Sequence, residues 1–167
     1  MPVLETKHFG KLSYEEDSEL EFPLGLPGFD DRKRFVAVHI VENDPLIYLQ
    51  SLEDPELCFI TMPILAIDPQ YRLKVSGETL EHLGLSSTRQ PRIGDDVMCL
   101  SVLSIRETGP TANLLAPIVV NLRNRKAVQA LAPESDYSHQ FALLPKELPK
   151  ESPKESPKEG LQEAAAC

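Results

Sequence analysis

The sequence predicts a mostly β fold: a compact, antiparallel, β-barrel-like domain with one or two short helices and a disordered C-terminal tail. Three observations predict it. Short runs rich in β-branched and aromatic residues alternate with clusters of Gly, Pro, Asn and Asp over residues 1–144. Only one segment has a convincing helical pattern, so the crossover helices that a parallel sheet requires are missing. Beyond Leu144, a short repeat leaves almost nothing apolar to bury.

The predicted strands follow one another closely along the chain. Arg34–Val41 is typical, because it is rich in β-branched residues and places Phe35, Ala37 and His39 on one face. The longest run is Val97–Arg106. The other predicted strands are Val3–Phe9, Ser18–Phe22, Leu46–Leu52, Leu57–Met62, Tyr71–Val75, Leu114–Leu122, Ala127–Ala132 and Tyr137–Leu143. Many short strands separated by turn residues indicate an antiparallel sandwich or barrel.

The predicted helix begins after Ser76, whose hydroxyl is suited to cap it. Glu78 lies in the first turn, and Leu80 and Leu83 share one face. Gly84 supplies a residue that adopts the left-handed conformation at a helix end. The pattern predicts about two turns of helix.

The C-terminal segment differs in composition from the rest of the chain. Residues 144–159 read LPKE, LPKE, SPKE and SPKE, and a proline at every fourth position blocks a stable helix. The sequence therefore predicts a folded domain over residues 1–144 and a disordered tail over residues 145–167. We assign the tail no role.

Charge indicates the class of partner. The chain has 167 residues and a formal charge of −9, of which residues 1–144 carry −8. An acidic surface repels phosphate backbones, so we expect no direct binding to nucleic acid. It suits a basic protein partner, although solubility alone also explains such a charge. Neither a membrane-spanning apolar run nor a secretory signal can be recognised, so we expect a cytoplasmic protein without a membrane partner.

No local motif predicts chemistry. The cysteines, Cys58, Cys99 and Cys167, form no C-x-x-C pair, and we expect reduced thiols. No histidine has metal-ligand spacing to another histidine or to a cysteine. The segment 25–28 (GLPG) lacks a phosphate-binding pattern and is typical of a rigid connection between strands. We therefore expect no catalytic, cofactor-binding or metal-binding residues, and a protein that is not an enzyme.

Four segments carry a resemblance to a known family. They are residues 21–30 (EFPLGLPGFD), 49–59 (LQSLEDPELCF), 79–85 (TLEHLGL) and 111–121 (TANLLAPIVVN), followed by Gln129 and Tyr137. Together they resemble the flagellar assembly factor FliW over about residues 4–143. The GLPGF and NLLAPIVVN segments are specific in combination and weak alone. Two features depart from the family: Thr61-Met62-Pro63, where a polar residue often precedes the proline, and the PKE tail.

The resemblance implies a barrel-like fold with very little helix, and it implies partners. FliW proteins bind the translational regulator CsrA, a small RNA-binding dimer, and prevent it from silencing flagellin mRNA. They also bind flagellin, so that each partner lowers the pool available to the other. The expected function is therefore a flagellar assembly factor that antagonises CsrA and acts as a chaperone-like partner of flagellin. We expect a monomer.

Polar members of the matched segments are the candidate partner-binding residues, because a barrel folds without them. Asn113 and Asn121 have the alternative of bonding loop backbone, and Phe29 is either an exposed anchor or a plug for the barrel end. We expect neutralisation of Glu53, Asp54 and Glu56 to weaken the antagonism of CsrA. The candidates are Phe29, Gln50, Ser51, Glu53, Asp54, Glu56, Asn113 and Asn121.

Two other functions remain open. The first is a small-molecule-binding β-barrel, for example a flavin-barrel-type enzyme, which predicts a deep apolar pocket with convergent polar groups. The second is a general secretion chaperone without a CsrA role. A protein-binding regulator predicts instead a filled barrel interior and a flat, partly apolar patch rimmed by acidic residues.

Overall fold

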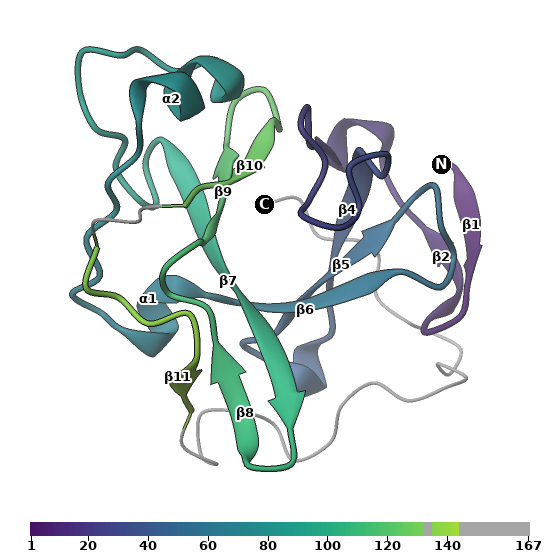
Figure 1. Ribbon diagram of the computed structural model, residues 1–167. Coiled ribbons are helices and arrows are strands. Elements are labelled where there is room, and N and C mark those ends of the chain that lie inside the picture. The colour runs from purple at the N-terminus through teal and green to yellow at the C-terminus, as the bar shows by residue number, and fades with distance from the viewer. Residues whose placement is uncertain (132–134, 144–167) are drawn as a thin grey trace.

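Eleven strands and two short α-helices form the part of the chain that the structure describes, residues 1–131 and 135–143 of a computed structural model (Figure 1). The helices are α1 (Ile64–Ile67) and α2 (Gly77–Leu83). The strands are β1 (Val3–Thr6), β2 (Gly10–Ser13), β3 (Glu19–Glu21), β4 (Arg34–His39), β5 (Ile47–Ser51), β6 (Cys58–Pro63), β7 (Val97–Arg106), β8 (Gly109–Ala112), β9 (Ile118–Asn121), β10 (Ala127–Gln129) and β11 (Phe141–Ala142). The mostly β fold class is confirmed. The predicted tail at 145–167 lies outside the described residues.

All the strand pairs are antiparallel. The main sheet has the order β10-β9-β7-β6-β5-β4-β3, and β8 extends from β7 to pair with β11. In Figure 1 the β7–β8 hairpin projects at the bottom of the view, and the separate β1–β2 hairpin lies at the right. The edge strands meet at one isolated bridge between Glu21 and Lys126, where the Glu21 amide donates to Arg125 O at 3.0 Å. The sheet therefore curls into a barrel-like shape whose two edges approach each other at this bridge, and β3 and β10 share no strand ladder.

Two apolar layers fill the two faces of this sheet. Strand β4 illustrates the alternation: Phe35 and Ala37 point into the barrel, whereas Val36 and Val38 point to the outer layer. The β1–β2 hairpin covers the outer layer with Phe9 and Leu12. The barrel interior is filled by side chains no more than 3% exposed: Leu20, Phe22, Leu26, Phe35, Ala37, Leu49, Leu100, Ile118, Val120 and Ala127.

The predicted helix is confirmed as α2. Ser76 Oγ accepts a hydrogen bond from the Thr79 amide at 3.1 Å, and Gly84 adopts a φ of 72° at the C-terminal end. Helix α1 was not predicted, because its four residues follow strand β6 without a polar capping residue. Among the described residues, no helix combines the length and the apolar character needed to cross a membrane.

Two predicted strands are wrong at specific places. The run Val3–Phe9 folds back on itself, because Thr6 Oγ1 accepts from the Phe9 amide (2.9 Å) and donates to Gly10 O (3.0 Å). The segment Tyr71–Val75 is not a strand. Its backbone bonds go to side chains instead of a ladder: Gln90 binds both the N–H and the carbonyl of Val75, at 2.7 and 2.9 Å.

Other strands are shorter than predicted. In the predicted strand Leu114–Leu122, strand β9 begins only at Ile118, because the Asn113 side chain holds a bend over Leu115 and Ala116. Tyr137–Leu143 contributes only the two residues of β11. The sequence pattern did not predict β2 or β8, each of which completes a hairpin.

Candidate partner-binding surface

The β5–β6 turn is shaped by the last two residues of β5. Ser51 Oγ accepts hydrogen bonds from the amides of Glu53 (3.1 Å) and Asp54 (3.0 Å), which closes the turn from within. Gln50 lies beneath it, and its Nε2 donates to Ser51 O at 3.0 Å and to Asp54 O at 3.3 Å. Both side chains are fully buried. They act on the shape of the turn and present no surface of their own.

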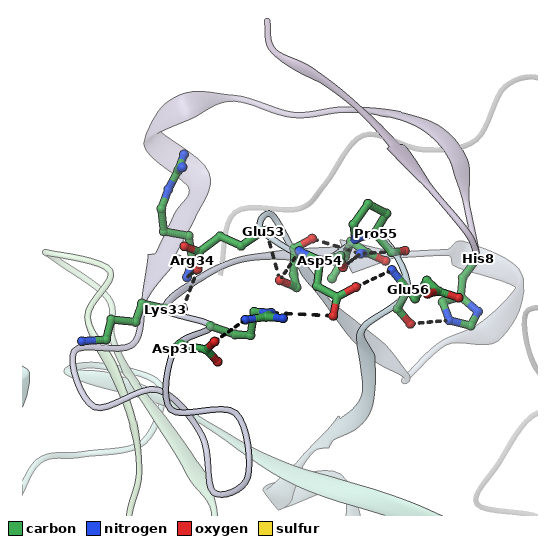
Figure 2. A network of polar contacts seen from close by, with 11 residues as sticks. His8, Asp31, Lys33, Arg34, Glu53, Asp54, Pro55 and Glu56 are labelled. Carbon is green, nitrogen blue, oxygen red and sulfur yellow. Dashed lines mark hydrogen bonds and ion pairs between the residues drawn. The ribbon is translucent and has the colours of Figure 1, made fainter.

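Glu53 fastens this turn to the neighbouring chain. Its Oε1 accepts hydrogen bonds from the backbone amides of Lys33 (2.6 Å) and Arg34 (3.0 Å), as Figure 2 shows. The Leu52 amide donates to Arg34 O at 2.9 Å, so that backbone bonds reinforce the junction. One carboxylate oxygen of Glu53 is therefore committed to the fold, although the residue as a whole is exposed.

Asp54 and Glu56 form the outer part of the turn. Asp54 Oδ1 accepts from the Glu56 amide at 3.0 Å, and Asp54 Oδ2 lies 3.6 Å from Arg32 Nε. The Glu56 side chain is 75% exposed, and its Oε1 lies 3.4 Å from Lys7 Nζ. Figure 2 also shows His8, whose Nε2 lies 3.2 Å from Glu56 O. We call residues 50–56 the acidic turn.

The loop between β3 and β4 runs beside the acidic turn, and its conformation explains the GLPGF segment. The Phe29 amide donates to Leu26 O at 2.7 Å, with Pro27 and Gly28 (φ 84°) at the central positions, which is the pattern of a type II turn. Gly25 has a φ of 66°, and a Cβ built there would lie 2.6 Å from the Asp30 backbone. Only glycine fits this crossing of the chain.

Phe29 lies at the surface end of a chain of aromatic contacts. Its ring packs edge-on against Phe59, with centroids 5.5 Å apart, and Phe59 contacts Phe35, which contacts Phe22 in the barrel interior. Phe29 is 36% exposed, whereas Phe22 and Phe35 are fully buried. The side chain therefore both covers the end of the barrel and offers apolar surface next to the acidic turn.

Asn113 and Asn121 do not join this network. Asn113 Oδ1 accepts from the amides of Leu115 (3.1 Å) and Ala116 (2.9 Å). Asn121 is 3% exposed, and its Nδ2 donates to Leu83 O at 2.8 Å, at the end of α2. Both side chains hold backbone in place, which is the alternative the sequence left open for them.

Charge is divided unevenly between the two halves of the domain. Residues 1–83, the acidic half of the domain sequence, carry 16 acidic and 7 basic side chains, whereas residues 84–144 carry 5 acidic and 6 basic ones. The acidic turn and the β3–β4 loop belong to the acidic half. Cations also lie among their carboxylates, and one of them, Arg34, makes a bidentate pair with Glu19 (2.8 and 3.1 Å) that raises the pKa of the guanidinium.

Two surface depressions bear on the alternative of a small-molecule site, and they differ in the character of their lining. An apolar depression of about 260 Å³ is lined by Pro63, Leu65, Ile93, Gly94, Val97, Met98, Cys99 and Leu122. A polar one of about 490 Å³ lies over Arg89, Gln90, Arg92, Asp95 and Asp96. A ligand site brings apolar walls and polar groups together. Within residues 1–131 and 135–143, no three His, Cys, Asp or Glu side chains are placed to hold a metal ion.

Sequence reasoning missed the residues that join the acidic turn from elsewhere in the chain. Lys7 and His8 come from the β1–β2 hairpin, about 50 positions away, and Arg32 from the β3–β4 loop. No local pattern marks them, because their role depends on how three hairpins meet. The run Asp30-Asp31-Arg32-Lys33-Arg34 was the one available signal, since it places cations beside two carboxylates.

Comparisons with known proteins agree on one family. The sequence model of the FliW protein family matches residues 3–143. The flagellar assembly factor FliW of Bacillus licheniformis is 35% identical over 137 residues, covering 81% of this chain and 92% of the relative. That of Syntrophomonas wolfei is 33% identical, covering 77% and 80%. A crystal structure of a flagellar assembly factor FliW superposes with a TM-score of 0.74 at 30% identity, covering 87% of this chain and 99% of that one.

Proposed function

Because this chain belongs to the FliW family of flagellar assembly factors, we propose that it binds the translational regulator CsrA, relieves the repression of flagellin mRNA, and binds flagellin as its alternative partner. The proposal places the protein in the cytoplasm as a monomer that needs no cofactor and catalyses no reaction. The observation that carries it is the acidic turn, a rigid group of carboxylates at the surface of the acidic half of the domain.

The acidic turn suits an RNA-binding partner. Such a protein has a basic groove, and carboxylates docked at the edge of that groove are attracted to it. The same carboxylates repel the phosphates of an incoming RNA. RNA binding is thereby inhibited without any need to cover the whole groove. Phe29 adds an apolar contact beside the charges, which is the composition of an interface core with a polar rim.

Rigidity favours this use of the turn. Backbone amides donate four hydrogen bonds to the side chains of Ser51 and Glu53. These bonds hold the turn and the β3–β4 loop together in the free protein. A partner therefore does not have to order the loop on binding, and less conformational entropy is lost. Gln50 and Ser51 take part as supports of the surface, Glu53, Glu56 and Phe29 are its exposed members, and Asp54 is half-buried among them.

A switch between two partners needs only mutually exclusive binding. If CsrA and flagellin each lower the affinity for the other, free flagellin sequesters the protein and releases CsrA, which then represses further flagellin synthesis. The filled barrel interior supports this protein-binding function over a ligand-binding barrel, because ten apolar side chains, each no more than 3% exposed, pack together there.

A pull-down with purified components tests the proposal. The immobilised chain is mixed with CsrA, with flagellin, and with both at increasing flagellin concentration. We expect each protein to be retained alone, and flagellin to release bound CsrA in a concentration-dependent manner. Retention of flagellin without CsrA would indicate a general secretion chaperone, and failure to retain either partner would overturn the proposal.

A further inference from the structure

Two buried polar atoms without a hydrogen-bond partner lie on either side of Asp54. Over the described part of the chain, they are the only buried side-chain nitrogen or oxygen atoms in this condition: Arg32 Nε and Gln50 Oε1. Buried polar groups are nearly always paired, and an orphaned one destabilises the state in which it occurs. One lies in the acidic turn and the other in the adjacent β3–β4 loop, so we infer that this surface is incomplete in the free protein.

Arg32 is held loosely between two carboxylates. Its Nη1 lies 2.6 Å from Asp31 Oδ2, an exposed group on the adjacent residue. Its Nε lies 3.6 Å from Asp54 Oδ2, which is within reach of an ion pair and too long for a hydrogen bond. The side chain is 32% exposed, so water and other cations reach it. Such partly exposed pairs contribute little to stability.

Gln50 supplies an independent indication of a missing donor. Its side chain is fully buried, and its Nε2 already donates to the backbone of the turn at Ser51 and Asp54. Its Oε1, on the same amide, accepts nothing. The open acceptor lies under the outer carboxylates of the turn, so the hydrogen bonding of this region is incomplete in the free protein.

We propose that Arg32 is an internal counter-ion of the acidic turn, and that a lysine or arginine of a basic partner protein displaces it from Asp31 and Asp54. This inference rests on the proposed function, in which the acidic turn meets a basic protein. In the free protein Arg32 lowers the repulsion between neighbouring carboxylates. In the complex the partner's cation takes its place, and Arg32 turns outward to solvent.

Removing Arg32 should have the opposite effect on affinity from removing an ordinary contact residue. Because Arg32 competes with the partner for the same carboxylates, its removal strengthens binding. We expect Arg32→Met, which keeps the aliphatic stem, to lower the Kd for CsrA by about two- to fivefold, the range that a partly exposed ion pair is worth. The matched control is Lys33→Met. Lys33 is exposed and adjacent, and its loss changes the net charge equally without freeing a carboxylate of the turn.

The experiment measures the Kd for purified CsrA with wild type, Arg32→Met and Lys33→Met at low and moderate salt, with thermal melting as a control for folding. Tighter binding by Arg32→Met than by Lys33→Met supports the proposal. Equal or weaker binding by a folded Arg32→Met overturns it. Should Arg32→Met fail to fold, the Nε–Hε NMR signal of Arg32 in the wild type decides: a shift on saturation with CsrA supports displacement, and an unchanged signal contradicts it.

The two proposals fail separately. If the wild type does not bind CsrA at all, the proposed function is wrong. Displacement of Arg32 is then tested with a hexa-arginine peptide at low salt, which presents the same guanidinium chemistry. The peptide should bind Arg32→Met more tightly than wild type or Lys33→Met. The same affinity for all three chains would show that Arg32 does not compete for the acidic turn.

Discussion

At the scale of single residues, the GLPGF segment owes its composition to the path of the backbone. Gly25 and Gly28 both have positive φ, but their surroundings differ. A Cβ on Gly25 would overlap the Asp30 backbone at 2.6 Å, whereas nothing lies within 4 Å of one on Gly28. Substitution of Gly28 by alanine therefore incurs only the cost of a left-handed conformation. Substitution of Gly25 adds the cost of a steric overlap.

We expect Gly28→Ala to lower the free energy of unfolding by about 1–2 kcal/mol, the cost of the left-handed conformation alone. Gly25→Ala should cost about 3 kcal/mol or more, because backbone must also move. Urea unfolding followed by circular dichroism measures both. Equal losses for the two variants would contradict the close approach seen at Gly25.

Buried thiols make stability depend on pH at the alkaline end. Burial raises the pKa of Cys58 and of Cys99 to about 12, whereas a thiol in the unfolded chain ionises near its ordinary value of 9.0. Below pH 9 the thiols are protonated in both states. As the pH rises from 9 towards 12, only the unfolded state releases their protons, so folding becomes less favourable.

The urea midpoint should therefore fall between pH 8 and about pH 10.5. Part of this fall also comes from Tyr48, whose pKa burial raises to about 12. The control is Cys99→Ala, which should show a smaller fall than wild type because one of the contributing groups is gone. A midpoint that stays constant over this range, or an identical fall in the variant, would argue against buried thiols.

At the scale of elements, strands and helix could be predicted where local pattern decides. The alternation of β4, the length of β7 and both caps of α2 follow from residues close together in sequence. The unpaired segment Tyr71–Val75 could not be predicted, because Gln90, 15 positions away, replaces a neighbouring strand. The same distinction holds for the candidate site. The turn that Ser51 closes is local and could be predicted, whereas Arg32 and Lys7 reach this turn only in the folded chain and could not.

Substitution of Asn121, which lies in the segment 111–121, tests whether this side chain stabilises the fold or contacts a partner. We expect Asn121→Ala to lower the free energy of unfolding by about 1–3 kcal/mol, because a buried hydrogen bond to the end of α2 is lost. Asn124→Ala is the control, since the exposed Asn124 donates to the same Leu83 carbonyl at 3.0 Å, and should cost less. A folded Asn121→Ala chain that loses only CsrA binding would instead indicate direct contact.

At the scale of the whole molecule, the excess of acidic side chains lies in residues 1–83, whereas residues 84–144 are close to neutral. The acidic half presents the acidic turn to solvent, so long-range attraction guides a basic partner towards it. Screening by salt weakens such steering, because the Debye length falls to about 10 Å at 0.1 M ionic strength.

The affinity for CsrA should therefore fall by roughly tenfold between about 0.05 and 0.5 M salt, mainly through a slower association rate. Surface plasmon resonance at several ionic strengths separates the two rate constants. An affinity independent of salt would mean that apolar contacts such as Phe29, and not the carboxylates, dominate the interface.

The central claim is that the acidic turn makes this chain an antagonist of CsrA. It is tested most directly by the release of CsrA from flagellin leader RNA, comparing wild type with Glu53→Gln/Asp54→Asn/Glu56→Gln. These substitutions keep the acceptor oxygens that bind the Lys33, Arg34 and Glu56 amides, and remove only the charges. We expect half-maximal release to need about ten times more of the folded triple variant than of the wild type. Release at the wild-type concentration would contradict it.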